Sequence, residues 1–595
     1  MKKRKSIATA SVTSLATGVL LSACSNASKS NNQTKISTSS LSSGEVKTTL
    51  SKVDKTKWQY NADDQVYYQV GISYVASPTD SEQQTLSIFV PAAYMTATEN
   101  GDGTYTAELN SKAKVGNYTA STAPIVIPIN TPGYSAMSAL TEYTSQAKTY
   151  TDEGFIYVSA GLRGRDSGAP SGVTDAKAAI RYLRYNANHI AGDMDRIFVF
   201  GMSGGGAQSS IIGASGDSAL YDDYLKQIGA VEGVSDAVAG VMAWCPITNL
   251  DTANEAYEWS MGSTRSDLST EEQTISDGLA EAYAKYINDL KLKDSKGNIL
   301  ELTKSTEGIY QAGSYYDYVK QTVEESLNTF LANATFPYDA SASTSGAPSG
   351  GEAPGGTPPS GQAPSSDFSS NGTESNSSPI EVVDNIQRGG SSISLSLSGT
   401  YNSVEEYISA LNSQSTWVTY DANSKKATIT SMADFVKYMK SATKGLSAFD
   451  ALDKSQGENE LFGYGDGQGV HWDSLLASLV KGTDYESDFT TDLAKSDSLG
   501  KSVSDRINMY TPLYYLSNYY DGYQTSNVAK YWRIRSGLSQ GDTALSTELN
   551  LSLALQNYGI KNVDFATVWG QQHTEAEVSG NSTSNFIEWV NKSLK

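Results

Sequence analysis

Short apolar runs, rich in β-branched residues and bounded by glycine or polar residues, recur through the first 250 positions of the chain. Such runs predict buried strands, and we expect them at 84–94, 123–130, 154–161, 196–200 and 238–245. Residues 174–187 carry their apolar side chains at helical spacing instead, and small residues that suit a helix follow position 203. Strands that alternate with helices predict an α/β fold with a mainly parallel sheet covered on both faces.

This rhythm is interrupted between residues 251 and 500, where polar helical segments predominate. Within them, residues 341–379 consist mostly of Ser, Gly, Pro and Ala without apolar periodicity, which is typical of a disordered loop. The alternation then returns, with strands expected at 530–537 and 562–569 and helices at 543–558 and 584–594. We therefore expect an α/β core formed by residues 56–250 and 501–595, split by a large, mostly helical cap at 251–500.

The first 24 residues have the pattern of an export signal. Residues 2–5 are all basic, residues 7–21 are moderately apolar, and the segment ends in LSAC at Cys24. This arrangement resembles a bacterial lipoprotein signal peptide, which predicts removal of residues 1–23, a lipid on Cys24 and a flexible tether at 24–55. A plain secretory signal with a chance cysteine is the alternative. As a lipoprotein, the protein would be held at the extracellular face of the bacterial cell membrane by its acyl chains alone.

Charge and composition exclude several classes of partner. The 595-residue chain carries a formal net charge of −21, which repels phosphate backbones and argues against nucleic acid. Its three histidines and two cysteines are scattered, so no metal site is expected, and no motif indicates a cofactor. Cys245 ends an apolar run and is expected to be a buried core thiol. No pattern specifies an oligomeric state.

A G-x-S-x-G motif directly follows the strand expected at 196–200. It reads Gly201-Met202-Ser203-Gly204-Gly205, and a small-residue helix follows it. In this strand–turn–helix setting the serine is a nucleophile on a tight, strained turn, and its glycines avoid Cβ clashes. Ser203 is therefore the candidate nucleophile, and the Gly204 N–H is an expected oxyanion donor. The alternative is a phosphate-binding turn, but Ala207 and Gln208 follow the glycines where such a loop needs lysine.

Elimination among three histidines selects the candidate base. In α/β-hydrolases the chain order is serine, acid, histidine, with the histidine in a loop after the last strand. His573 follows the strand at 562–569 and fits this order. His189 precedes the nucleophile in an expected surface turn, and His471 lies in the cap region and is the second choice. With His573 as base, activity is expected to rise near pH 6–7, around the reference pKa of the imidazole.

The acid is expected in the turn after the strand at 530–537. Asp542 is the only carboxylate in that turn, and it would hold the imidazole tautomer and stabilise the imidazolium. Asp542 could instead, or as well, be the N-cap of the helix at 543–558. The second oxyanion N–H is expected from the loop Asn130-Thr131-Pro132-Gly133-Tyr134, with Gly133 or Tyr134 as the donor.

Several stretches together resemble the bacterial tannases of subtype B, esterases of the α/β-hydrolase fold that cleave galloyl esters. These stretches are NTPGY, GLRGR, AAIRYLRYN, GMSGGGA, CPITNLDTANEAYEW, AFDAL, ENELFG, WRIR and VDFATVWGQQH, in order from about residue 120 to 575. The resemblance implies ester hydrolysis through an acyl-enzyme, with Ser203 as nucleophile and His573 as base. It also implies that Lys444 and Glu458 in the cap contact the phenolic hydroxyls of the galloyl ring. The alternative for both is an ordinary solvated cap charge.

One position departs from that family pattern. The family has two aspartates one residue apart, the first completing the triad and the second binding the ring; here these positions hold Gln540 and Asp542. Because an amide does not stabilise an imidazolium as a carboxylate does, three outcomes are open: Asp542 takes the triad role, the acid is Asp521 or Asp564, or activity is impaired. If Asp542 moves into the triad, one ring contact is lost, and a related aromatic or small ester becomes an alternative substrate.

Three classes of function therefore compete. The first is a serine esterase acting on small phenolic esters, and the second is a serine peptidase or general carboxylesterase on the same fold. The third is a non-catalytic surface-binding lipoprotein, which the glutamine at position 540 favours. The first requires no cofactor, and its partner is the small ester itself.

Overall fold

The computed structural model describes residues 45–340, 395 and 397–595 of the chain. The expected signal peptide with Cys24 and the low-complexity segment 341–379 lie outside the described residues. Among the described residues, no helix is both long and apolar enough to cross a membrane.

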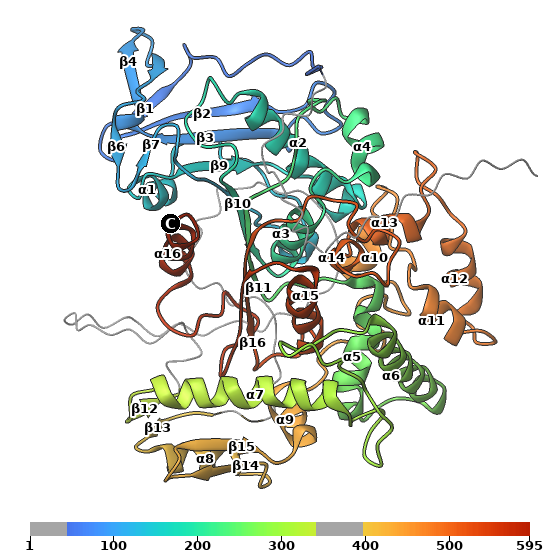
Figure 1. Cartoon of the computed structure of the whole chain (residues 1–595). Helices are drawn as coiled ribbons and strands as arrows, with labels where there is room; N and C mark the ends of the chain where they lie inside the picture. The colour runs from blue at the N-terminus through green and yellow to red at the C-terminus, as the bar shows by residue number, and fades with distance from the viewer. Residues whose placement is uncertain (1–44, 341–394, 396) are drawn as a thin grey trace, which may run out of the picture. The chain divides into compact units, whose positions relative to one another are not determined.

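A nine-stranded sheet organises the fold, with strand order β1-β2-β3-β9-β8-β10-β11-β16-β17 (Figure 1). Neighbouring strands from β9 to β17 pair in parallel, whereas the edge from β1 through β3 to β9 is antiparallel. The strands are β1 (Gln59–Asn61), β2 (Val66–Ser73), β3 (Thr85–Pro91), β8 (Ile125–Pro128), β9 (Ile156–Ala160), β10 (Ile197–Met202), β11 (Gly240–Trp244), β16 (Tyr531–Gly537) and β17 (Asn562–Val568). The strands expected from apolar runs are thus present; β8, β9 and β11 are buried on both faces, whereas the edge strand β17 is partly exposed. Two small hairpins flank the antiparallel edge, β4–β5 (Met95–Glu99, Tyr105–Leu109) and β6–β7 (Lys114–Val115, Tyr118–Thr119).

Helices cover both faces of this sheet (Figure 1). One face packs against α1 (Ser145–Thr151) and α16 (Ser582–Ser593), where Phe586 lies 4.4 Å from Phe200 between ring centroids. The other face packs against α2 (Ser171–Tyr185), α3 (Gly204–Ala214) and α15 (Leu545–Tyr558), with α4 (Asp222–Gln227) beyond α2. There Gly213 lies so close to the sheet that a Cβ would clash with Val241, at 2.2 Å, and would crowd the Trp532 ring, at 3.1 Å.

The chain between β11 and β16 forms a group of helices and small sheets that packs against the core, in which α6 and α7 are long and most other elements are short. Its helices are α5 (Ala253–Met261), α6 (Thr270–Leu290), α7 (Ser314–Asn333), α8 (Val404–Leu411), α9 (Met432–Met439), α10 (Gly457–Leu461), α11 (Ser474–Leu479), α12 (Glu486–Leu493), α13 (Val503–Met509) and α14 (Pro512–Leu516). Two two-stranded sheets accompany them, β12–β13 (Tyr338–Asp339, Thr400–Tyr401) and β14–β15 (Val418–Asp421, Lys426–Ile429). Neither sheet was expected from the sequence. Helix α10 contacts the loops that follow β8 and β9, so this inserted chain reaches the carboxyl ends of the strands.

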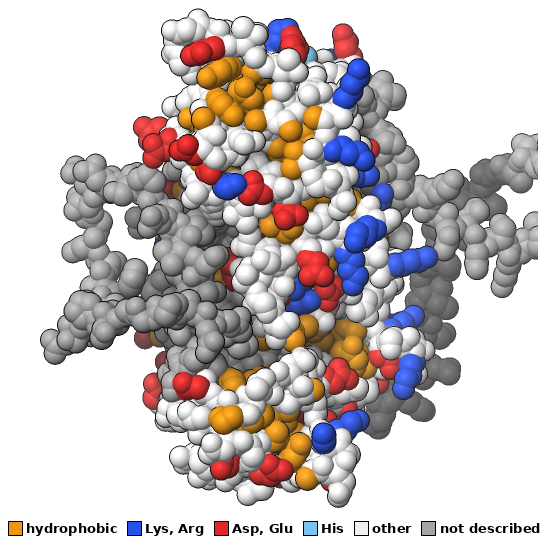
Figure 2. Space-filling model, turned by 90° about the vertical axis from the view of Figure 1, so that its left-hand side faces the viewer, with side chains coloured by type: hydrophobic (Ala, Val, Ile, Leu, Met, Phe, Trp, Pro, Cys, Tyr) orange, Lys and Arg blue, Asp and Glu red, His pale blue; other side chains and the backbone are white. Residues whose placement is uncertain are grey.

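The surface in Figure 2 shows acidic and basic side chains along the length of the molecule and hydrophobic atoms in several separate patches. On that face most of the basic side chains gather along the right-hand edge of the view, whereas acidic side chains are spread from top to bottom.

Candidate active site

Ser203 occupies the tight turn between β10 and α3. Its backbone has φ 58° and ψ −122°, a left-handed conformation that costs a non-glycine residue free energy. The Ser203 N–H donates to the carbonyl oxygen of Trp244 at the end of β11 (2.9 Å), which holds the turn against the sheet. Strain retained at a residue that the neighbouring strands hold in place is typical of a functional turn.

The glycines around Ser203 are required by backbone contacts. A Cβ on Gly205 would lie 1.9 Å from the carbonyl oxygen of Ile129, and one on Gly201 would lie 2.4 Å from the same atom. Both distances are far below any real contact, and the obstructing atom is backbone, so it cannot swing away. The glycine spacing of the motif therefore reflects the close approach of the β8 loop to the turn.

His573 reaches Ser203 from the loop after β17. Its Nε2 lies 2.9 Å from Ser203 Oγ, and its side chain is 5 % exposed. The loop is positioned by Cys245, whose Sγ–H donates to the carbonyl of Thr574 (3.3 Å), and by Ser539, whose N–H donates to the carbonyl of Gln571 (2.8 Å). The structure thus brings together the predicted nucleophile and the predicted base.

Burial dominates the electrostatics of this histidine. Desolvation lowers the pKa of His573 from 6.5 to about 4, against the Asp542 carboxylate, which raises it. The ammonium groups of Lys444 and Lys440 lower it further. The imidazole is therefore neutral near pH 7, the form that accepts a proton. The expected onset of activity at pH 6–7 shifts accordingly to about 4.

The other two histidines lie elsewhere. His471 is fully buried, with Nδ1 2.8 Å from Asp450 Oδ1 and its ring stacked on Phe489. Asp450 also accepts from the Asn459 side chain and from two backbone N–H groups, so this dyad holds inserted loops together. His189 is exposed in a turn.

The turn after β16 is built around Gln540. Its Oε1 accepts from the N–H groups of Asp542 (2.7 Å) and Thr543 (3.0 Å), and its Nε2 donates to Thr543 Oγ1 (2.9 Å). The side-chain amide of Gln540 therefore forms its hydrogen bonds within the turn and not with His573. Helix α15 begins at Leu545 with Ala544 as its N-cap, so the alternative of Asp542 as the N-cap is wrong. The Gln540 side chain provides the local closure that a capping carboxylate would have provided.

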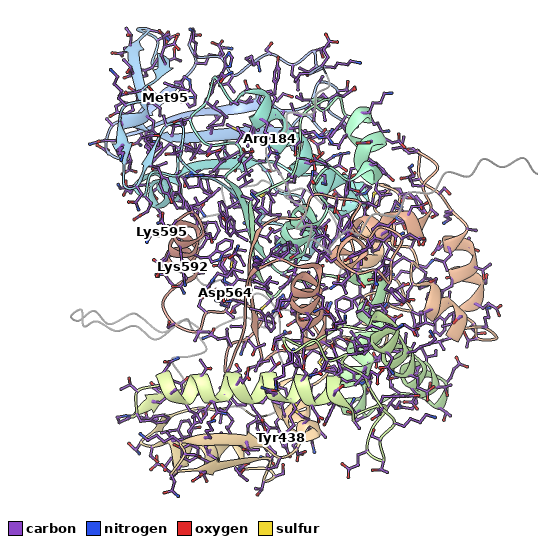
Figure 3. All side chains as sticks on the ribbon, viewed as in Figure 1. Met95, Arg184, Tyr438, Asp564, Lys592 and Lys595 are labelled. Carbon is purple, nitrogen blue, oxygen red and sulfur yellow. The ribbon has the colours of Figure 1, made fainter. Side chains whose placement is uncertain are left out.

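Asp542 is the carboxylate whose charge acts on His573. It raises the pKa of the imidazole, but no hydrogen bond joins the two side chains. Asp542 Oδ2 and His573 Nδ1 are both buried and form no hydrogen bond with any described residue. The other two carboxylates considered are not candidates. Asp564, labelled in Figure 3, lies on β17 and pairs with Arg535 at 2.8 Å, and Asp521 is exposed.

Two further titratable residues lie beneath this turn and were missed from the sequence. Lys440 is buried, and its Nζ donates to the carbonyl of Gln540 (3.1 Å). Glu548 on α15 is also buried, accepts from Thr543 Oγ1 (3.0 Å), and has its pKa raised to about 7 by desolvation. Burial likewise lowers the pKa of Lys440, although the Glu548 charge opposes this. Neither residue belongs to a motif, and only the fold brings them together.

The predicted oxyanion donors meet at the start of α3. A Cβ on Gly204 would lie 3.2 Å from the Gly133 nitrogen and 2.6 Å from the Tyr134 nitrogen, so the two segments touch. The Tyr134 N–H donates to the carbonyl of Thr131 (3.0 Å), and its hydroxyl donates to the carbonyl of Ile247. The N–H of Tyr134 is therefore already hydrogen-bonded to Thr131, which leaves Gly133 as the candidate oxyanion donor of this loop. Gly133 has φ 54°, where a side chain would be strained.

Glu458 belongs to α10, and Lys444 contacts the N-cap residue of that helix, Gln456. Lys444 Nζ lies 3.3 Å from the Gln456 side chain and 4.7 Å from the centroid of the Phe449 ring, and its charge reaches His573. Glu458 is 4 % exposed, and its carboxylate adds to the burial that raises the pKa of Tyr134. The alternative of a solvated surface charge does not fit the burial of Glu458. The inserted chain therefore supplies an ammonium whose charge reaches His573 and a buried carboxylate whose charge reaches Tyr134 in the expected oxyanion loop.

The chain is similar to one protein family and to several solved structures. A model of the BD-FAE family matches residues 115–288, which include β8 to β11 and Ser203. No curated protein matches the sequence. Among solved structures, the tannase from Lactobacillus plantarum superposes with a TM-score of 0.64 and 25% identity, over 92% of this chain and 100% of that one.

Two more solved structures extend the comparison. The Fusobacterium nucleatum tannase matches with a TM-score of 0.64 and 25% identity, over 89% of this chain and 95% of that one. A tannin acyl hydrolase in complex with ethyl gallate matches with a TM-score of 0.63 and 26% identity, over 92% and 99%. The chain therefore has the α/β fold of these hydrolases, and the expected α/β-hydrolase fold class is confirmed.

Proposed function

We propose that the protein is a serine carboxylic ester hydrolase that cleaves galloyl or related phenolic esters through an acyl-enzyme. The observation that carries this proposal is the 2.9 Å contact between His573 Nε2 and Ser203 Oγ on a strained strand–helix turn. A neutral buried imidazole within hydrogen-bond reach of a serine hydroxyl is the arrangement that nucleophilic acyl transfer needs. The similarity to solved tannases supports the ester class, since one of them holds ethyl gallate.

In the proposed reaction Ser203 Oγ attacks the ester carbonyl while His573 Nε2 takes the hydroxyl proton. The negative oxygen that develops receives hydrogen bonds from the N–H groups of Gly204 and Gly133. His573 then gives its proton to the leaving alcohol, and the acyl group stays on Ser203. Water, activated by the same imidazole, releases the acid and restores the serine.

We assign the role of triad acid to Asp542. Its carboxylate is the one that stabilises the protonated form of His573, which is the electrostatic task of the acid. Gln540 cannot share that task because its amide closes the turn. In the family pattern the residue at position 542 binds the substrate ring, and the one at position 540 is the triad acid. If Asp542 is the triad acid here, it no longer contacts the ring, and ring recognition rests on Lys444 and Glu458. An ammonium donates to phenolic oxygens and a carboxylate accepts from phenolic hydroxyls.

A panel of four substrates tests the class: methyl gallate, methyl ferulate, p-nitrophenyl acetate and a proline-containing peptide. We expect kcat/KM for methyl gallate to be well above that for the others. Ser203→Ala should lower turnover at least ~10³-fold. Preference for the peptide would make the protein a peptidase. If Ser203→Ala were as active as the wild type, the serine mechanism would be wrong.

Ring recognition has its own test. Lys444→Met and Glu458→Gln should each raise KM for methyl gallate about tenfold, the value of one good polar contact, and leave p-nitrophenyl acetate unaffected. Lys437→Met, which removes an exposed lysine nearby in the sequence, is the matched control. Equal effects on both esters would contradict a role in binding the ring.

The proposed location rests on residues 1–24 alone. We propose that the mature protein is a lipoprotein whose acylated Cys24 holds it on the outer face of the cell membrane. Cys24→Ser should release the protein from the membrane fraction, and retention of this variant would contradict the anchor.

A further inference from the structure

Arg165 ends the GLRGR stretch and starts the short 3₁₀ turn Arg165–Ser167 after β9. Its Nη1 donates to the carbonyl oxygen of Gly133 at 2.9 Å. Its Nε donates to Glu460 Oε2 at 2.6 Å, and Glu460 belongs to α10. One guanidinium therefore binds both the expected oxyanion loop and the helix that carries Glu458.

The contacts around this guanidinium are close on both sides. A Cβ on Gly133 would lie 3.1 Å from Arg165 Nη1, and one on Gly457 would lie 2.6 Å from the same atom. A Cβ at the first position of α10 would therefore displace the guanidinium of Arg165. The neighbouring Arg163 has a different task, because its guanidinium binds Asp175 within the core at 2.8 Å.

The Gly133 contact acts on the orientation of an N–H group. Gly133 has no side chain and adopts φ 54°, so its own backbone does not fix its conformation. Tyr134 anchors the far side of this residue through its N–H and its hydroxyl. The hydrogen bond from Arg165 to the Gly133 carbonyl helps to fix the Gly133–Tyr134 peptide. The Gly133 N–H belongs to the preceding Pro132–Gly133 peptide, which only the φ and ψ rotations of Gly133 separate from the fixed one. The contact therefore restrains the direction of the Gly133 N–H through the backbone of the glycine itself.

The Glu460 contact acts on α10. Glu458 and Glu460 are two positions apart, and side chains at that spacing do not face each other on a helix. Arg165 can therefore hold Glu460 while the Glu458 carboxylate remains directed elsewhere, next to Tyr134. The end of the helix is secured separately, by the Ala169 N–H on the Leu461 carbonyl (2.6 Å) and by Arg506 on the Phe462 carbonyl (2.7 Å).

We infer that Arg165 is a positioning residue that couples the oxyanion loop to the ring-binding helix through the Gly133–Arg165–Glu460 bridge. Binding of an aromatic acyl group against Glu458 then sets the position of α10, and through Arg165 the alignment of the Gly133 N–H. The inference rests on the proposed ester hydrolysis, because both ends of the bridge belong to that site.

The bridge is poorly suited to a purely structural role. The side chains of Arg165 and Glu460 are 37% and 27% exposed, and ion pairs at such exposure contribute little to stability. Loss of the arginine should therefore leave the protein folded and change only its kinetics. This separates Arg165 from Arg163, whose partner is fully buried.

The test compares Arg165→Gln, Arg165→Lys and Glu460→Gln with the wild type on methyl gallate and p-nitrophenyl acetate. Arg165→Gln should lower kcat about tenfold for both esters, less than the ~10²–10³ for outright loss of an oxyanion donor, because the N–H is misaligned and not removed. Glu460→Gln keeps the Gly133 contact, so it should raise KM for methyl gallate about threefold and leave p-nitrophenyl acetate unchanged. Arg165→Lys should fall between wild type and Arg165→Gln, since an ammonium lacks the planar fork.

Lys285→Met is the matched control, because it removes an exposed ion pair with Asp289 on α6. The melting temperatures of Arg165→Gln and of this control should agree. A much lower melting temperature of Arg165→Gln would make the residue structural and overturn the inference. Wild-type kcat on both esters for Arg165→Gln would overturn it as well.

The experiment distinguishes failure of the proposed ester hydrolysis from failure of the Arg165 bridge. If the wild type cleaves p-nitrophenyl acetate and not methyl gallate, the phenolic substrate is wrong and the Glu460 half of the bridge fails with it, but kcat for p-nitrophenyl acetate still decides the Gly133 half. If the wild type cleaves neither ester and is labelled at Ser203 by a fluorophosphonate, the labelling rate replaces kcat. A tenfold slower labelling of Arg165→Gln supports the bridge, and equal rates refute it.

Discussion

His573 uses only one of its two ring nitrogens: Nε2 lies 2.9 Å from Ser203 Oγ, while the buried Nδ1 bonds no described residue. In a complete triad Nδ1 donates to a carboxylate that holds the ring and stabilises its cation. Here Asp542 supplies the charge without the hydrogen bond. A hydrogen bond between these two unpaired atoms would complete the triad, which makes Asp542 the residue on which turnover is expected to depend.

Replacing Asp542 with asparagine tests that dependence. Asp542→Asn keeps the shape of the side chain but removes the charge that stabilises the imidazolium, so kcat for methyl gallate should fall about 10²–10⁴-fold. Asp521→Asn, at an exposed aspartate, serves as the control and should change nothing. Steady-state kinetics at pH 7 measure both. Wild-type turnover by Asp542→Asn would exclude the residue as the acid.

The pH profile should report the lowered pKa of His573. Because the folded pKa is about 4, below the reference of 6.5, the base stays unprotonated down to about that pH. kcat/KM should therefore rise through about pH 4 and be nearly level from pH 5.5 to 8. A profile of initial rates on p-nitrophenyl acetate, corrected for its spontaneous hydrolysis, measures this. An acid limb at pH 6–7 would show that the imidazole is better solvated or better paired than in this structure.

Replacing Lys440 should shift the acid limb of the pH profile. Its charge lowers the pKa of His573, so Lys440→Met should raise this pKa and move the acid limb to higher pH. The variant also loses the hydrogen bond to Gln540 and leaves Glu548 without its countercharge, so kcat should fall as well. Lys437→Met, in helix α9 whose C-cap is Lys440, is the control for a lost exposed lysine. An unchanged limb in Lys440→Met would mean that its charge does not reach the imidazole.

Gly205→Ala tests the backbone contact behind the nucleophile. Its Cβ would lie 1.9 Å from the Ile129 carbonyl, so the β8 loop or the turn must move. We expect a loss of several kcal/mol in the free energy of unfolding, as for other changes that force atoms into an occupied core, together with loss of turnover. Gly445→Ala, where a Cβ meets nothing within 4 Å, should stay within about 0.5 kcal/mol of the wild type. Denaturant unfolding measures both, and similar stabilities would refute the clash.

Much of the core could be predicted because its signals are local. The apolar runs at 123–130, 196–200 and 562–569 became β8, β10 and β17, shortened or shifted by one or two residues. The helix expected at 543–558 begins two residues later, because Gln540 and Thr543 form the turn that precedes it. The hairpin β14–β15 was missed, since short strands in a polar segment leave little apolar pattern.

The sequence by itself determined the nucleophile turn and the base. The motif at residues 201–205 predicts a tight turn after a strand. Of the three histidines, only His573 follows the last expected strand. Such features depend on neighbours in the chain and on strand order, which a sequence records. Tertiary structure alone decided the surroundings. It brings the charge of Asp542 to His573 without a hydrogen bond, the charge of Lys440 to Glu548, and Arg165 between Gly133 and Glu460. The partners in these contacts are separated by 31 to 295 positions in the sequence. Their hydrogen bonds and charge interactions act over only a few ångströms. They therefore arise only once the core and the inserted helices have packed together.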